Sequence, residues 1–94
     1  MLSQLPIDLG KVSKQELDKE ILRLGMIAEL DAVSLYEQLA GMTQDKDLKK
    51  ILLDIAKEEK THIGEFQSLL LERDKEQVRE IEAGKKEVEK EMGR

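Results

Sequence analysis

The nine residues AGMTQDKDL, at positions 40–48, separate two long helical patterns and decide how the chain folds. Gly41 is suited to ending a helix, because glycine tolerates the backbone conformation found just past helix C-termini. Asp45 is a good N-cap residue for a second helix, and Asp47 in its first turn is favoured by the helix dipole. A loop of this length makes the flanking helices antiparallel neighbours. The stretch therefore predicts a two-helix hairpin.

The boundaries of the helices follow from similar signals further out. Ser13 and Glu16 have the spacing of a capping box, which predicts a first helix from about residue 14 to about residue 40. The second helix is expected to run to about residue 71 or 73. Asp74 then repeats the N-cap pattern and opens a shorter third helix, expected to be interrupted near Gly84 and to end in a frayed tail.

These boundaries predict an all-α chain with three parts. They are an extended N-terminal arm over residues 1–12, a helical hairpin over residues 13–73, and a short C-terminal helix with a tail over residues 74–94. Two helices of about 26 residues are each about 40 Å long. A hairpin of that length does not bury both of its apolar stripes by itself.

The composition excludes several classes of protein. Ninety-four residues fit one small domain, and a net charge of −5 argues against a nucleic-acid binder. The absence of cysteine excludes disulfides, zinc ribbons and iron–sulfur clusters. No apolar run approaches the roughly 20 residues that cross a bilayer, and the N-terminus lacks the pattern of a signal peptide. The expectation is a soluble cytoplasmic protein with neither membrane nor nucleic-acid partners.

Three side chains with metal-binding chemistry lie on apolar helix faces. On a wheel of about 100° per residue, Glu59 and His62 fall in the apolar stripe of the second helix, and Glu29 falls in that of the first. A carboxylate there costs several kcal/mol unless it is paired or binds a cation, and no lysine or arginine shares the stripes. Glutamate and histidine at a spacing of three, with a glutamate on a neighbouring helix, supply half of a di-iron site. Carboxylate oxygens and imidazole nitrogen suit iron or manganese.

The ligand count links this metal site to the oligomeric state. One chain offers two carboxylates and one imidazole, which is too few for two metal ions. A two-fold dimer offers four carboxylates and two imidazoles, the full set of a di-iron centre in a four-helix bundle. We therefore expect two hairpins to dimerise with the metal pair on the two-fold axis.

Simpler explanations exist for each residue taken alone. A lone histidine such as His62 on an apolar face is more often a core or interface residue than a ligand. Glu29 could be protonated or hydrogen-bonded by Tyr36, whose ring is either core or close to the metal. Glu58 and Glu65 fit solvated surface charge. The conjunction of two glutamates and the histidine favours a metal site.

Two motifs resemble a known family. The stretch ELDAVSLY at residues 29–36 is similar to the first-helix motif of rubrerythrins and ferritin-like proteins, and EEKTH at residues 58–62 is similar to their second-helix motif. Those proteins carry two such hairpins in one chain. A single hairpin with this spacing resembles the encapsulated ferritins, which are associated with encapsulin nanocompartments.

The resemblance implies a function and a site. Glu29, Glu59 and His62 are expected as ligands of a di-iron ferroxidase centre, with Glu59 bridging the metals and manganese or zinc as substitutes. It also implies a dimer assembled further into a ring, commonly a decamer, which oxidises Fe(II) to Fe(III) inside an encapsulin shell in the cytoplasm. Asp31, Tyr36 and Glu58 are expected to lie in the surroundings of the metals or on the access route.

The resemblance is incomplete at two places. Asp31 matches one acidic residue near the metal access route of bacterial members, whereas Ala28 replaces another. The charged end, residues 86–94, lacks the small apolar peptide that docks cargo to a shell. It implies a shortened chain or the ferritin-like domain of a shell fusion, and a member without a shell remains open. The rival functions are a rubrerythrin-like di-iron peroxide reductase and a helical oligomerisation module without metal.

Overall fold

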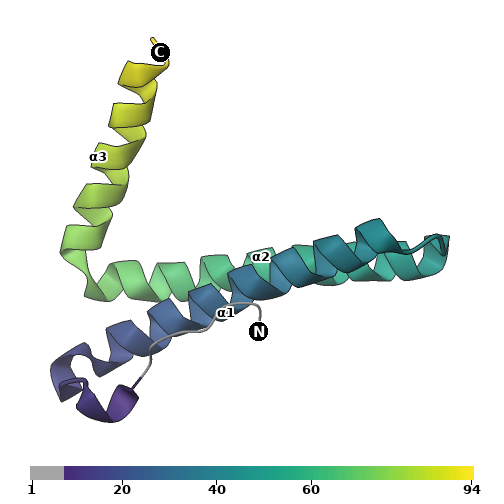
Figure 1. Cartoon of the computed structure of the whole chain (residues 1–94). Helices are drawn as coiled ribbons and strands as arrows, with labels where there is room; N and C mark the ends of the chain where they lie inside the picture. The colour runs from purple at the N-terminus through teal and green to yellow at the C-terminus, as the bar shows by residue number, and fades with distance from the viewer. Residues whose placement is uncertain (1–7) are drawn as a thin grey trace.

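The computed structural model describes residues 8–94 and is entirely helical over that range (Figure 1). A short 3-10 helix precedes three α-helices, and their bounds are η1 Leu9–Lys11, α1 Lys14–Met42, α2 Lys46–Arg73 and α3 Lys75–Glu91. α1 and α2 lie side by side and antiparallel, and α3 leaves the end of α2 at a steep angle. The predicted all-α fold, a helical hairpin with a short C-terminal helix, is confirmed.

The hairpin turn is built by its own side chains. The Asp45 backbone N–H donates to the Thr43 hydroxyl oxygen at 3.1 Å, and the Asp45 carboxylate accepts from the Leu48 N–H at 2.9 Å. Asp45 is therefore the N-cap of α2, as predicted. α1 continues through Gly41 and ends at Met42, so the expected stop at Gly41 falls one residue early.

The capping box predicted at the start of α1 is absent. Ser13 occupies the N-cap position, but its side chain makes no capping hydrogen bond. The Glu16 carboxylate does not reach back to Ser13, because it faces along the helix to the Lys19 ammonium at 3.5 Å. Opposite charges three residues apart are neighbours on a helix surface, and this pairing takes the place of the cap.

The predicted extended arm is wrong over its last residues. Residues 1–7 lie outside the described residues, whereas Leu9–Lys11 form η1. The Asp8 carboxylate accepts from the Gly10 N–H at 3.1 Å, and the Lys11 N–H donates to the Asp8 carbonyl at the same distance. A short polar side chain bonding to the backbone two residues ahead favours a turn over extended chain.

The interruption predicted near Gly84 does not occur, since α3 is continuous from Lys75 to Glu91. A glycine inside a helix costs about 1 kcal/mol relative to alanine but keeps both of its backbone hydrogen-bonding groups. Acid and base at a spacing of four, as at Glu82 and Lys86, favour helix on either side of it. The tail expected to fray is therefore helical to Glu91.

The core of the hairpin is narrow. Among the described residues, the buried apolar side chains lie along the seam between α1 and α2, and they are Leu22, Ala40, Ala56 and Leu70. The radius of gyration is 16.7 Å, whereas a compact domain of this length has a value of about 12 Å. Much apolar surface therefore stays uncovered in one chain. No described helix is both long and apolar enough to cross a membrane.

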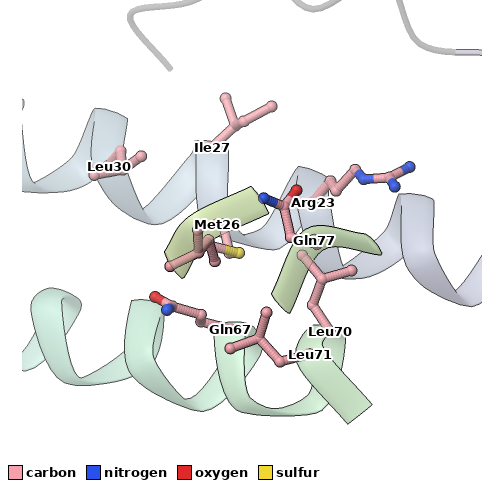
Figure 2. Close-up of a pocket in the computed structure, with 9 residues that line it drawn as sticks. Arg23, Met26, Ile27, Leu30, Gln67, Leu70, Leu71 and Gln77 are labelled. Atoms are coloured by element: carbon pink, nitrogen blue, oxygen red, sulfur yellow. The ribbon is translucent and has the colours of Figure 1, made fainter. Parts of the chain in front are cut away.

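The hairpin has two different faces. Helical spacing places Ile51 and Leu69 on the side of α2 that bears His62, and it places Ile21 and Leu35 together on one side of α1. All four side chains are exposed, and we call this side of the hairpin the site face. Its two helices meet where Ile21 of α1 and Leu69 of α2 line a common hollow. The opposite face carries Met26 and Leu30 from α1 and Leu71 from α2. There α3 adds Gln77 and Ile81 to enclose a second hollow of about 500 Å³ (Figure 2).

One residue joins α2 to α3 and fixes their angle. Asp74 is both the C-cap of α2 and the N-cap of α3, where its carboxylate accepts from the Gln77 N–H at 2.9 Å. The same carboxylate accepts from the Arg23 guanidinium of α1 at 3.0 Å, and Arg23 also pairs with Glu20 at 2.6 Å. The first helix therefore holds the junction between the other two.

Gly25 and Phe66 set how closely α1 and α2 approach near the middle of the hairpin. A Cβ atom built on Gly25 would lie 3.0 to 3.1 Å from three carbons of the Phe66 ring. Real Cβ atoms are rarely that close to other carbons, so the ring packs directly on the glycine backbone. The absence of a side chain at residue 25 is therefore what allows the ring to lie between the helices.

We predict that Gly25→Ala lowers the stability of the hairpin. Overpacking costs about 1–3 kcal/mol, and the gain in helix propensity returns about 1 kcal/mol, so the free energy of unfolding should fall by about 1 kcal/mol. Gly41→Ala is the matched control on the same helix, because nothing lies within 4 Å of its added Cβ. Urea unfolding followed by circular dichroism compares the two. Equal or higher stability of Gly25→Ala would contradict the close packing.

A second prediction concerns the pH dependence of the α2–α3 junction. The pKa of Asp74 lies below its ordinary value, mainly because the carboxylate accepts from the Gln77 N–H, and also because Arg23 donates to it. A lowered folded-state pKa gives stability that is present above about pH 4 and is lost as the pH falls through the folded value. The protection of α3 amides against hydrogen exchange, measured relative to the intrinsic rate at each pH, should therefore fall below about pH 4 in the wild type.

The comparison variant is Asp74→Asn, which keeps a capping side chain and removes the titrating charge. It should show faster α3 exchange at neutral pH and a smaller change on acidification. Asp45→Asn, at the N-cap of α2, is the control at a cap with no arginine partner among the described residues. An identical acid response of α3 in wild type and Asp74→Asn would contradict the assignment.

Candidate metal centre

The structure brings Glu29, Glu59 and His62 together in the middle of the hairpin. Glu29 lies on α1, and the other two lie one turn apart on α2, because a spacing of three residues places them on neighbouring positions of one helix face. The imidazole Nδ1 is 3.3 Å from Oε2 of Glu59 and 3.4 Å from Oε2 of Glu29. One donor atom from each residue lies within 4.8 Å of the others.

The two carboxylates are mostly buried and lack a fixed positive partner. The side chains of Glu29 and Glu59 are 20% and 19% exposed, whereas His62 is 46% exposed. Oε2 of Glu29 is fully buried and has no hydrogen-bond partner. Within the described part of the chain, the only ion pairs of these two glutamates are with His62, so no lysine or arginine neutralises them. A buried carboxylate oxygen without a hydrogen-bond partner is costly, and a bound cation would offset that cost.

Two of the distances between the three donors fit one metal ion at this point. At metal–ligand bonds of about 2.1 Å, two ligands at the tetrahedral angle lie about 3.4 Å apart, and two opposite ligands about 4.2 Å apart. The observed spacings of 3.3 and 3.4 Å match the smaller separation. Two carboxylates and an imidazole are a donor set suited to iron, manganese or zinc. The Nδ1 atom is the imidazole nitrogen that faces the carboxylates.

A small hollow opens beside these donors. It has a volume of about 150 Å³, and Glu29, His62, Glu65 and Phe66 line it; we call it the site hollow. Glu65 follows His62 by three residues on α2. The sequence predicted that Glu65 is a solvated surface charge, and its side chain is exposed. The residue also borders the hollow that leads to the candidate ligands Glu29 and His62. Its spacing of three from His62 was the signal that could have revealed this.

The other residues expected around the metals lie further away. Tyr36 is half-buried on α1, seven residues after Glu29 and therefore on nearly the same side of the helix. Asp31 is half-buried two residues after Glu29, which directs it to nearly the opposite side. Glu58 is exposed beside Glu59. None of the three lines the site hollow or joins the group of converging donors.

An ion pair across the opposite face supports the register at the site. The Lys60 ammonium of α2 lies 3.0 Å from the Glu37 carboxylate of α1. Lys60 follows Glu59 in the sequence, and Glu37 lies about two turns beyond Glu29 on α1. Both partners are about half exposed, and exposed pairs contribute at most about 1 kcal/mol. The pair helps to align the helices, whereas Gly25 and Phe66 set their separation beside the site.

Solved structures and characterised relatives share this hairpin. The structure matches the crystal structure of the encapsulated ferritin domain from Pyrococcus furiosus with a TM-score of 0.85 and 50% identity, covering 100% of this chain and 98% of that one. In sequence it is 56% identical over 81 residues to a ferritin-like–encapsulin shell fusion protein of Pyrococcus furiosus, and 38% identical over 68 residues to the encapsulin nanocompartment cargo protein EncC of Myxococcus xanthus.

The shares of each chain that are covered differ. The match to the fusion protein takes in 86% of this chain and 23% of the relative, and the match to EncC takes in 72% and 52%. The chain thus spans about a quarter of one relative and about half of the other. A comparison with protein families matches residues 6–83 to the EncFtn-like family. Since this match covers most of the 94 residues, the chain belongs to the EncFtn-like family.

Proposed function

We propose that this protein is a ferroxidase, which oxidises Fe(II) to Fe(III) at a di-iron centre shared by two chains. The observation that carries the proposal is the group of three donors around a buried oxygen of Glu29 that has no hydrogen-bond partner. Glu59 and His62 complete that group from the neighbouring helix. These ligands are hard enough to favour the Fe(III) product, and family membership supports iron as the substrate.

The sharing of the centre follows from the number of ligands. Three donors from one chain leave one metal ion under-coordinated and cannot hold two. A second copy related by a two-fold axis doubles the set to four carboxylates and two imidazoles, as in ferritin-like di-iron proteins. The 46% exposure of His62 on the site face supports this arrangement, because the residue is accessible to a partner.

The apolar surface around the site supports dimerisation through the same face. Ile21, Leu35, Ile51 and Leu69 are each more than a third exposed there. Apolar area removed from water contributes about 25 cal/mol per Å², so covering these side chains favours association. The same contact would exclude water from the two glutamates, which strengthens their attraction for a cation. Metal binding and dimerisation would then stabilise each other.

The reaction needs little covalent chemistry from the protein. Two Fe(II) ions give up one electron each, and together they reduce one dioxygen molecule, with two protons, to hydrogen peroxide. Glu29, Glu59 and His62 hold the iron and favour its higher charge. The site hollow, which Glu29 and His62 line, gives the substrate a route to them.

The relatives support a setting for this activity. One is named as a fusion with an encapsulin shell and another as an encapsulin cargo protein. We infer that this chain also works inside an encapsulin nanocompartment in the cytoplasm, where the shell receives the Fe(III). We further propose that its dimers assemble into a ring, with a decamer as the expected size. Such a ring would explain why the face bearing α3 also keeps exposed apolar side chains, among them Leu30 and Ile81.

The proposal predicts two irons per dimer. Anaerobic titration of Fe(II), followed by native mass spectrometry, should saturate at that ratio, because two chains supply one complete site. Glu59→Gln should lose the specific iron, and Glu72→Gln is the charge-matched control on the same helix, away from the site hollow. Admission of dioxygen should then yield Fe(III) in the control only. Equal iron binding by both variants would favour a helical assembly module without a metal centre.

The proposal also predicts which face forms the dimer. Ile51→Glu places a charge on the site face, and Leu30→Glu places one on the face bearing α3; the two residues are 55% and 53% exposed, so neither is needed for the fold of one chain. Sedimentation velocity should show loss of the dimer, at least tenfold in dissociation constant, for Ile51→Glu only. A dimer that survives Ile51→Glu and is lost in Leu30→Glu would place the interface on the other face.

A further inference from the structure

Glu65 has a position that the three metal ligands leave unexplained. It lies on α2 one turn beyond His62 and lines the site hollow together with Glu29 and His62. Its own side chain is exposed, whereas the Glu29 side chain is only 20% exposed and its buried Oε2 has no hydrogen-bond partner. The hollow therefore joins an exposed carboxylate to a buried one.

The size of the hollow suits a partly hydrated cation. Its volume of about 150 Å³ exceeds the roughly 10–15 Å³ that one water molecule needs, so the hollow admits water beside a cation. A divalent ion that arrives with its water shell can therefore enter and exchange waters for protein oxygens one at a time. A carboxylate at the mouth lowers the barrier of that exchange, because it replaces a lost water with a charged ligand.

The charges along α2 leave Glu65 available for a cation. The residue belongs to an acidic row on the outer edge of the site face, with Glu58 seven residues before it and Glu72 seven residues after it. Glu72 is paired with Arg73 at 3.6 Å. Among the described residues, no lysine or arginine lies within ion-pairing distance of Glu65, and the nearest lysine in sequence, Lys60, is held by Glu37 on the opposite face.

We propose that Glu65 captures Fe(II) at the mouth of the site hollow and passes it to Glu29 and His62. The inference rests on the proposed ferroxidase site and adds the step that loads it. Glu65 is a transient ligand and not a member of the final coordination set, because its exposed carboxylate does not join the group of converging donors. Its removal should slow loading and leave the final metal content unchanged.

The test measures metal uptake directly, with Co(II) as a redox-stable probe. Stopped-flow absorbance gives the rate of Co(II) binding to the full chain, and an endpoint titration gives the stoichiometry. Glu65→Gln should reduce the association rate about three- to tenfold at low ionic strength, and the difference should shrink as salt screens the charge. Glu65→Asp should restore part of the rate. Glu72→Gln, which removes the same charge two turns away, should bind almost like the wild type.

Each result decides between the claims. Equal rates for Glu65→Gln and Glu72→Gln would overturn the capture role and leave the ferroxidase site intact. A lower final Co(II) content in Glu65→Gln would also overturn it, because Glu65 would then be a permanent ligand. A changed dimer dissociation constant with an unchanged rate would make Glu65 an interface residue. Indistinguishable Co(II) binding by the wild type and Glu59→Gln would instead refute the underlying metal site.

Discussion

The structure is organised around two carboxylates that lie between two helices without a lysine or arginine beside them. Glu29 and Glu59 converge on one imidazole, and the inner oxygen of Glu29 has no hydrogen-bond partner. Such a group is unfavourable in a hairpin that works alone. It becomes favourable when a cation takes the place that a lysine or arginine would otherwise hold. The register of the helices and the close approach at Gly25 both serve this convergence.

The two faces of the hairpin differ in how far the chain covers them. The site face leaves His62 of the three candidate ligands accessible and keeps its apolar side chains exposed, as the proposed dimer requires. The other face is partly closed by α3 and by the ion pair between Lys60 and Glu37. The narrow row of buried residues leaves a single chain with little core.

The parts of the fold set by local rules could be predicted from the sequence. The caps at Asp45 and Asp74 and the three-residue spacing of Glu59 and His62 depend on neighbours within one helical turn, and the structure contains them. The capping box at Ser13 was wrong because Lys19 competed for Glu16. The break expected at Gly84 was wrong because one glycine does not outweigh the helix-forming residues on both sides.

Features that depend on contacts between helices were beyond sequence reasoning. Periodicity placed Glu29 on the inner side of α1, but only packing shows how near it comes to His62. Glu65 lies outside the apolar stripe, and only its spacing of three from His62 separates it in the sequence from other surface acids. The contact of Arg23 with Asp74 joins residues 51 positions apart, and no local rule predicts such a pairing.

The junction at Asp74 also determines how far α3 can rotate relative to α2. Because Asp74 is the single residue between α2 and α3, a rotation of its backbone moves the third helix as a stiff rod. Seventeen residues at 1.5 Å each make α3 about 26 Å long, so a rotation of about 10° at Asp74 displaces the far end of the helix by about 4–5 Å. The ion pair between Arg23 and Asp74 limits this rotation. The helix that bears Glu29 therefore also sets the direction of α3.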